Sequence, residues 1–164
     1  MNLKGKTFII TGGGSGLGAA TARLFAESGA NVVVADLKEA NAKAIESEIG
    51  GQARAIKCDV TNTDEVKASI ALAQEAFGGL HGAVNCAGIG SAMRTTSKNG
   101  PFDLDMFKFT INVNLIGTFN VIRLVATAIS DNAPDEGGER GVFINTASVA
   151  AFDGQIGQAA YSAS

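Results

Sequence analysis

Short runs of apolar and β-branched residues alternate with segments of helical periodicity along almost all of this 164-residue sequence. The apolar runs predict strands at residues 7–10, 31–35, 53–57, 82–85 and 142–146. The periodic segments predict helices at residues 16–28, 39–49, 63–77 and 103–129, with another opening near Tyr161. This alternation is the signature of βαβ units, whose strands are parallel and buried on both faces. The sequence therefore predicts an α/β protein with a Rossmann-like, doubly wound parallel sheet.

Length, charge and cysteine content narrow the classes of function. The chain fits one domain, residues 1–164, and its net charge of −3 without a basic stripe argues against nucleic acid and membrane surfaces as partners. Cys58 and Cys86 lie far apart without metal-ligand spacing, which argues against a disulfide framework and a metal site. The N-terminus runs directly into the first predicted strand, and no apolar run approaches the roughly 20 residues that span a bilayer. We therefore expect a soluble, cytoplasmic protein that acts on a small molecule.

A glycine-rich turn, Thr11-Gly12-Gly13-Gly14-Ser15-Gly16-Leu17-Gly18, connects the first predicted strand to the first predicted helix. Glycines let the backbone turn sharply and approach a pyrophosphate closely, and the amides at a helix start present the positive end of its dipole. A glycine-rich turn alone is weak evidence, but here a strand precedes it and a helix follows it. The turn therefore predicts a dinucleotide site at Gly12, Ser15, Gly16, Leu17 and Gly18.

Asp36 follows the second predicted strand, roughly 20 residues beyond the glycine turn. At this place an acidic side chain can accept hydrogen bonds from the hydroxyls of the adenosine ribose. The same negative charge would repel a 2′-phosphate. Asp36 therefore favours NAD over NADP as the cofactor.

With these features the chain resembles the short-chain dehydrogenase/reductase family, whose TGxxxGxG turn is matched by Thr11, Gly12, Gly16 and Gly18. Further residues match the family's motifs in order along the chain. They are Asp59 and Val60, Asn85-Cys86-Ala87-Gly88 with cysteine replacing the family's second asparagine, Asn114, Ser148, and Tyr161 opening a YxxxK motif. The resemblance implies that Asp59 and Val60 hold the adenine ring and that Asn85, Cys86, Ala87 and Gly88 form the cofactor turn after the fourth strand.

The resemblance also implies three catalytic residues. Tyr161 would be the acid/base and would contact the cofactor, Ser148 would polarise the substrate oxygen, and Asn114 would support a proton relay. Ser148 and Tyr161 are thirteen residues apart, one at a strand end and one at a helix start, so both hydroxyls can face one pocket. A free tyrosine, with a pKa of about 10, needs a neighbouring positive charge to act as a base at neutral pH.

One subgroup of the family is matched more closely, through residues 114–124, 137–142, 145–152 and 154–158. That subgroup oxidises (3S)-3-hydroxyacyl-CoA to the 3-oxo thioester with NAD as acceptor. The resemblance therefore implies a role in fatty acid metabolism, an acyl-CoA substrate bound beside Gln155 and Gln158, and a homotetramer built on the long helices.

The sequence stops one position before the lysine of the YxxxK motif, which would lie at i+4 on the same helical face as Tyr161. We expect the natural chain to continue for about 90 residues, carrying that lysine, further strands and the substrate-covering helices. We expect the 164-residue chain itself to bind dinucleotide weakly and to turn over negligibly. Its last strand would form an exposed apolar edge.

Two other functions stay open at this point. The first is a reductase of the same family that acts on 3-oxoacyl carriers or another carbonyl, which a cofactor-preference assay would separate from an NAD-dependent dehydrogenase. The second is a non-catalytic dinucleotide-binding or scaffolding protein that dimerises through the helix at residues 103–129. A lysine at position 165 would favour an enzyme over a binding protein.

Overall fold

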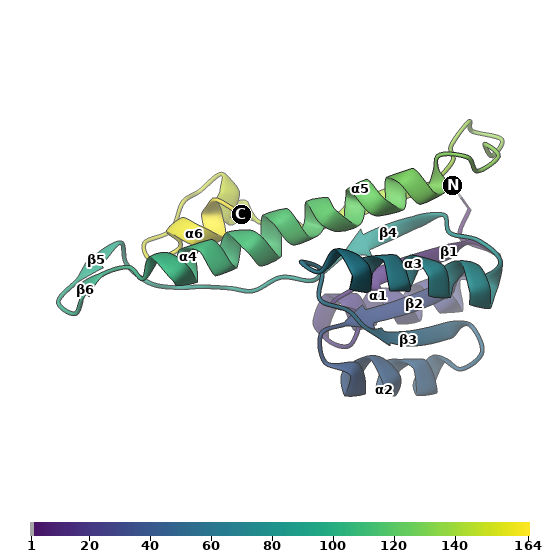
Figure 1. The fold of residues 1–164 in the computed structure, drawn as a ribbon, viewed down its shortest axis with the longest axis horizontal. Coiled ribbons are helices and arrows are strands. Elements are labelled where there is room, and N and C mark those ends of the chain that lie inside the picture. The colour runs from purple at the N-terminus through teal and green to yellow at the C-terminus, as the bar shows by residue number, and fades with distance from the viewer. Residues whose placement is uncertain (1) are drawn as a thin grey trace.

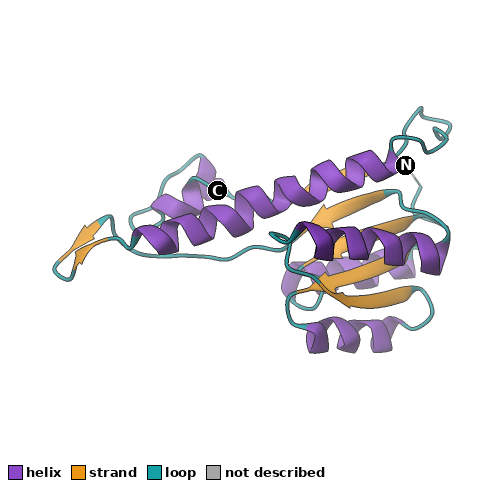
Figure 2. Ribbon diagram, viewed as in Figure 1, coloured by secondary structure: helices purple, strands orange, loops and turns teal. Residues whose placement is uncertain are grey.

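A computed structural model describes residues 2–164 of the chain. Five parallel strands form one sheet in the order β3-β2-β1-β4-β7 (Figure 2). They are β1 (Thr7–Thr11), β2 (Asn31–Asp36), β3 (Ala53–Lys57), β4 (Gly82–Asn85) and β7 (Val142–Asn145). The α/β class and the doubly wound parallel sheet predicted from the sequence are confirmed, and β7 is an edge strand as expected.

Helices connect the strands and cover both faces of the sheet (Figure 1). They are α1 (Gly16–Glu27), α2 (Glu39–Ile49), α3 (Thr63–Phe77), α4 (Leu104–Ile111), α5 (Thr118–Ile129) and α6 (Ala159–Ser162). The start of α3 shows why sequence predicts these boundaries well. The side chain of Asn62 accepts hydrogen bonds from the amides of Asp64 and Glu65, which would otherwise lack a partner inside the helix.

The sheet has a hydrophobic core on each face because successive side chains of a strand point to opposite sides. Phe8 and Ile10 of β1 pack with the residues of α1 and α2, whereas Ile9 between them packs with α3 and α5. All three side chains are almost fully buried, and each contributes about 1.5–3 kcal/mol by leaving water. Continuous apolar strands are therefore needed to hold both helical layers.

The long helix predicted at residues 103–129 is present, but a π-helical segment, η1 (Asn112–Gly117), separates α4 from α5. Figure 1 shows α5 running alongside β4 while α4 extends beyond the sheet. Val121, Val125 and Ile129 bury one face of α5 in the core shared with α3. A π segment changes the hydrogen-bond register of the backbone and often marks a functional site.

The same helix corrects the expectation that no apolar run approaches the length needed to span a bilayer. Residues Leu104–Ile129 form a helix of 26 residues whose most apolar window has a mean hydropathy of 1.4 and is 28% buried. Core helices of soluble proteins meet the same criteria of length and composition, and α5 already packs one face against the sheet.

The polar segment at residues 90–101, predicted as a loop, contains a short antiparallel pair of strands. These are β5 (Thr96–Ser97) and β6 (Gly100–Pro101), which form a hairpin at the outer end of α4 (Figure 1). Two residues in each strand are too few to show the alternation by which a strand is recognised in sequence. The hairpin is exposed, so no core pattern indicates it either.

Candidate active site

The glycine-rich turn lies at the carboxyl end of β1 and leads directly into α1. A Cβ atom on Gly18 would lie 2.3 Å from the carbonyl oxygen of Gly12, and one on Gly12 would lie 2.9 Å from the amide nitrogen of Ala87. Only glycine therefore allows the turn, the helix and the loop after β4 to approach so closely. The first turn of α1 has no acidic residue, and its N-cap, Ser15, forms no capping hydrogen bond. The positive end of the helix thus remains available to an anion.

Asp36 lies at the carboxyl end of β2 and is buried, with 9% of its surface exposed. Its Oδ2 accepts a hydrogen bond from the amide of Gly14 at 2.9 Å, and its Oδ1 accepts one from the amide of Lys38 at 2.9 Å. An ionised carboxylate has about four acceptor positions, so two remain for ribose hydroxyls. Asp36 therefore fixes the glycine turn, and its carboxylate lines a cavity at this end of the sheet.

A cavity of about 440 Å³ lies along the carboxyl ends of β1, β2, β3 and β4. It brings together nearly all of the residues predicted to bind the cofactor. They are Gly12, Ser15, Gly16, Leu17, Gly18, Asp36, Asp59, Val60, Cys86, Ala87 and Gly88. A cavity at the carboxyl ends of parallel strands, above a glycine turn, fits a dinucleotide.

Sequence reasoning missed several other residues that line this cavity. Thr61 and Ile89 each extend a predicted motif by one residue and could have been found by that continuity. Phe109 and Val113 come from the long helix, and only the tertiary fold shows that they reach the cavity. The remaining unpredicted lining residues are Leu37, Lys38, Asn41 and Cys58.

Asn85, which was also predicted to bind the cofactor, lies outside this cavity but lines the smaller neighbouring cavity described below. Its side chain is 3% exposed, and its Nδ2 donates to Oδ1 of Asn145 on β7 at 2.8 Å. Immediately after it, the amide of Ala87 donates to Oγ1 of Thr11 at 3.2 Å. These bonds fix the loop after β4 to both neighbouring strands, so Asn85 contributes to the site by positioning this loop.

Asn114, Ser148 and Tyr161 line one cavity of about 190 Å³, which shares Cys86, Ala87 and Gly88 with the larger cavity. The structure therefore brings the three predicted catalytic residues together. Asn114 lies in η1, Ser148 at the start of the turn η2 (Val149–Ala151), and Tyr161 in α6. Ser148 Oγ accepts a hydrogen bond from the amide of Ala150 at 3.2 Å, which orients the side chain at the end of its loop.

The side chain of Asn114 forms three hydrogen bonds that join separate parts of the site. Its Oδ1 accepts from the amide of Ile89 at 2.8 Å, and its Nδ2 donates to the carbonyl of Ile89 at 3.0 Å. Nδ2 also donates to Oγ of Ser164 at 2.9 Å. Asn114 thus fixes the loop after β4 relative to the segment that carries Tyr161.

The two residues predicted to contact substrate are placed differently. Gln158 lines a third cavity of about 550 Å³ together with Tyr161 and residues 88–92, and its Oε1 is buried without a partner within residues 2–164. Gln155 is exposed and lies in the turn before Gln158, outside the three cavities described above. The amide of Met93 donates to the carbonyl of Gly157 at 2.7 Å and joins this turn to the loop after β4.

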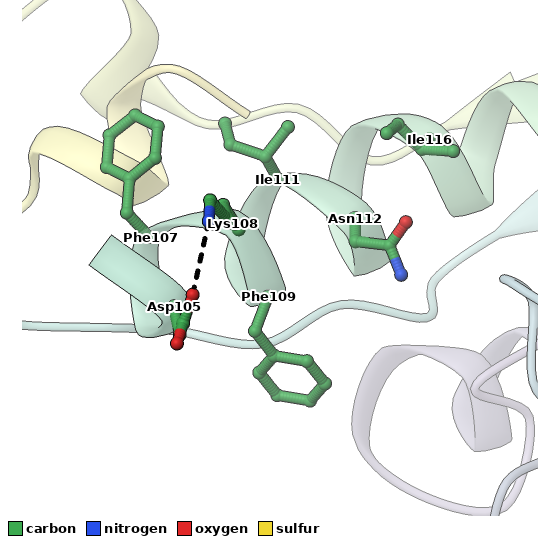
Figure 3. A pocket seen from close by; sticks show the side chains of 7 residues that line it. All are labelled: Asp105, Phe107, Lys108, Phe109, Ile111, Asn112 and Ile116. Carbon is green, nitrogen blue, oxygen red and sulfur yellow. Dashed lines mark hydrogen bonds and ion pairs between the residues drawn. The ribbon is translucent and has the colours of Figure 1, made fainter. Parts of the chain in front are cut away.

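A fourth cavity, of about 480 Å³, lies on the long helix (Figure 3). Phe107 and Ile111 point to one side of the helix, whereas Phe109 points to the opposite side. Its charged groups, Asp105 and Lys108, form an exposed ion pair at 3.2 Å. The cavity contains none of the predicted catalytic residues, and within residues 2–164 no cluster of His, Cys, Asp and Glu could hold a metal ion.

Comparison with known proteins agrees with this arrangement. The family model for short chain dehydrogenases matches residues 6–164. The chain belongs to the short-chain dehydrogenase family. Within this family it is 51% identical over 165 residues to 3-hydroxyacyl-CoA dehydrogenase type-2 of Rattus norvegicus and 49% identical to that of Homo sapiens. Each alignment covers 99% of this chain and 63% of the relative, so the chain spans less than two thirds of these dehydrogenases.

Solved structures of the short-chain dehydrogenase family share the fold. The crystal structure of 3-hydroxyacyl-CoA dehydrogenase type-2 from Mycobacterium avium superposes with a TM-score of 0.92 at 43% identity, covering 97% of this chain and 62% of that one. The 3-ketoacyl-(acyl-carrier-protein) reductase from Brucella melitensis, solved with NADH, gives 0.85 at 31% identity and covers 98% and 64%. The fold therefore agrees with that of the family.

Proposed function

We propose that this chain binds NAD and that the complete protein oxidises (3S)-3-hydroxyacyl-CoA to 3-oxoacyl-CoA. The observation that carries the proposal is the shared wall of two cavities. Cys86, Ala87 and Gly88 separate the glycine-turn cavity from the one lined by Ser148 and Tyr161. A dinucleotide on the glycine turn would therefore reach the two hydroxyl groups. The type-2 3-hydroxyacyl-CoA dehydrogenases, at about half identity, support the substrate class.

The strand order supports one orientation of the dinucleotide in the cavity. With the pyrophosphate at the glycine turn after β1, Asp36 ends β2 and Val60 follows β3 on one side. Ser148 and Tyr161 both follow β7, which lies beyond β4 on the other side. The adenosine half therefore belongs above β2 and β3, and the nicotinamide half belongs beside Ser148 and Tyr161.

The residues at the nicotinamide end can perform alcohol oxidation. Tyr161 takes the proton of the substrate hydroxyl, while Ser148 donates a hydrogen bond to the same oxygen. The hydride on the carbon that carries this hydroxyl would pass to bound NAD, which would supply the oxidant for the reaction. Asn114 forms hydrogen bonds both to the loop after β4 and to the segment that carries Tyr161. These bonds fix the distance between the loop and that segment, which form two walls of the site.

Asp36 supports NAD rather than NADP as the cofactor. Its carboxylate is fixed by two backbone amides at the ribose end of the cavity and cannot turn away from an added phosphate. Repulsion between the carboxylate and a 2′-phosphate would weaken NADP binding.

The test uses the protein expressed from its complete gene, with NADH formation followed by absorbance on a series of 3-hydroxyacyl-CoA substrates. We expect turnover with NAD, and a loss of kcat of at least about a hundredfold in Tyr161→Phe with little change in NAD affinity, because only the proton transfer is removed. Ser148→Ala tests the second hydroxyl in the same way. Full activity of both variants would exclude this chemistry, and an absence of NAD binding would exclude the cofactor.

A reductase acting on a 3-oxoacyl carrier is the second candidate. It is favoured by the 0.85 TM-score to the Brucella melitensis 3-ketoacyl-(acyl-carrier-protein) reductase. The two candidates differ in the carrier. Higher kcat/KM with acyl-carrier-protein thioesters than with CoA thioesters would favour the reductase.

We also propose that the complete protein is a cytoplasmic homotetramer that packs through the long helix. The outer face of this helix exposes large apolar side chains that a soluble protein usually covers. They are Leu104, Met106, Leu115, Ile116 and Phe119. Light scattering coupled to gel filtration would give the number of subunits.

A further inference from the structure

Asn120 of α5 is a buried polar residue that joins the long helix to the loop after β3. It is 5% exposed, and its Nδ2 donates a hydrogen bond to the carbonyl oxygen of Val60 at 2.7 Å. Val60 is itself 6% exposed and lines the adenosine side of the cofactor cavity. This hydrogen bond therefore connects the helix directly to a residue of the binding site.

The orientation of the Asn120 amide follows from its neighbours. Arg123 donates to Asn120 Oδ1 from Nε at 3.1 Å and from Nη2 at 2.7 Å, and Thr63 Oγ1 donates to the same oxygen at 3.3 Å. A guanidinium group has only donors, so the oxygen of the amide must face Arg123 and the nitrogen must face Val60. The hydrogen bonds from Arg123 and Thr63 to Oδ1 therefore orient Nδ2 of Asn120 toward the carbonyl of Val60.

Gly117, one turn before Asn120, brings the helix against the same residue. A Cβ atom at Gly117 would lie 2.5 Å from Cγ2 of Val60 and 3.3 Å from its Cβ. Because valine is branched at Cβ and buried here, its side chain has little freedom to move aside. Glycine at position 117 therefore allows the loop to approach the helix more closely than any other residue would.

Other bonds fix the shape of the loop and attach its start to β2 and α3, where the amide of Cys58 donates to the carbonyl of Asp36 at 2.9 Å. Asp59 Oδ1 accepts from the amide of Thr61 at 2.9 Å and from its hydroxyl at 2.8 Å, both within the loop. The amide of Asp59 donates to Glu65 Oε2 on α3 at 2.7 Å. Val60, at the centre of the loop, is held by Asn120 and Gly117.

We infer that Asn120 and Gly117 are positioning residues for the adenosine half of the cofactor, acting through Val60. The inference rests on the proposed NAD site. Asn114 and Asn120 then have parallel roles, because the first fixes the loop after β4 and the second fixes the loop after β3. One helix sets both side walls of the cofactor cavity.

The experiment compares two half-cofactor probes, AMP and nicotinamide mononucleotide, on the protein expressed from its complete gene. In Asn120→Ala, loss of a buried hydrogen bond should raise the Kd of AMP and the KM of NAD about tenfold. The Kd of nicotinamide mononucleotide and kcat should change less than about twofold, because Asn120 does not line the cavity of Ser148 and Tyr161. Thr127→Ala is the control, since it removes an exposed hydroxyl bond from the same helix and should change neither affinity.

Three further substitutions distinguish a specific effect from a general folding defect. Asn120→Asp keeps the size and the acceptor for Arg123 but cannot donate to Val60, so it should reproduce the loss of AMP affinity. Gly117→Ala should also weaken AMP binding, because its Cβ atom would clash with Cγ2 of Val60. In a Val60→Ala background, which lacks Cγ2, the same substitution should weaken AMP binding much less. This coupling between positions 117 and 60 is expected only if the helix acts through Val60.

The outcomes separate the inference from the proposed function. A selective loss of AMP affinity in Asn120→Ala and Asn120→Asp supports the inference. Equal losses for both probes, or no loss for either, overturn it while NAD binding by the unmodified protein still stands. If the unmodified protein binds neither AMP nor NAD, the proposed function fails and the inference fails with it.

Discussion

Replacing Asp36 with asparagine tests the two roles that the structure gives to this carboxylate. Asp36 accepts one backbone amide on each oxygen, from Gly14 and from Lys38. The amide of an asparagine can accept on its oxygen but not on its nitrogen. One of the two backbone N–H groups would therefore face a donor and stay without an acceptor in a buried place.

An unsatisfied buried N–H costs about 1–3 kcal/mol, so we take about 2 kcal/mol as the loss in the free energy of unfolding. For a domain of this size, each kcal/mol lowers Tm by about 2–4 °C, which gives a decrease of roughly 4–8 °C. The control is Asp131→Asn, which makes the same change at an exposed residue without a hydrogen bond or ion pair among residues 2–164. It should shift Tm by less than about 2 °C.

The assay is thermal unfolding of both variants without cofactor, followed by KM for NAD and for NADP. Removing the charge should reduce the preference for NAD over NADP about tenfold. An Asp36→Asn protein as stable as the Asp131→Asn control would refute the structural role of the carboxylate. A lower Tm with an unchanged cofactor preference would show that Asp36 holds the glycine turn but does not select the cofactor.

Three more predictions concern single residues. Gly18→Ala places a Cβ atom 2.3 Å from the carbonyl oxygen of Gly12, so it should abolish NAD binding in a calorimetric titration, and retained affinity would contradict the turn geometry. Burial lowers the pKa of His81, whose Nδ1 accepts a hydrogen bond from the amide of Thr7 at 3.1 Å. The folded protein therefore favours the neutral imidazole, and the contribution of His81 to the free energy of unfolding is fully present above the unfolded pKa of about 6.5. This contribution should be lost as the pH falls through the lowered folded pKa. The free energy of unfolding of His81→Gln, measured in urea, should lack this dependence on pH. Burial raises the pKa of the Cys58 thiol, so its alkylation at neutral pH should be much slower in native than in unfolded protein, and equal rates would contradict its burial.

Much of the sheet could be predicted from the sequence because its strands are buried on both faces. Val32, Val33 and Val34 form an unbroken apolar run, and all three are fully buried in β2. A run of this kind, bounded by glycine or by polar residues, has few other ways to cover its surface. The predicted bounds of β3, β4, α2 and α3 agree with the structure for the same reason.

The site residues that could be predicted are those that belong to short motifs of residues close in sequence. The glycine turn, Asp36 and the Ser148–Tyr161 pair each depend on a few residues in a recognisable order, and the structure places them around connected cavities. The π segment was not predicted, because a shifted backbone register leaves the apolar periodicity of a helix almost unchanged. Asn120 was not predicted either, because an asparagine within a helix shows its role only through partners distant in sequence.

The glycine turn itself depends on contacts far from it in sequence, and this links the cofactor site to the rest of the fold. Gly12 can lie where it does only because its missing side chain leaves room for the amide nitrogen of Ala87, 75 residues later. That loop is held in turn by Asn85 from within the sheet and by Asn114, through Ile89, from the long helix. A shift of the long helix would therefore change the cofactor site at the loop after β4 and, through Val60, at the loop after β3. Cofactor affinity in this protein should accordingly depend on how the long helix is packed, even though most of that helix lies outside the cavity.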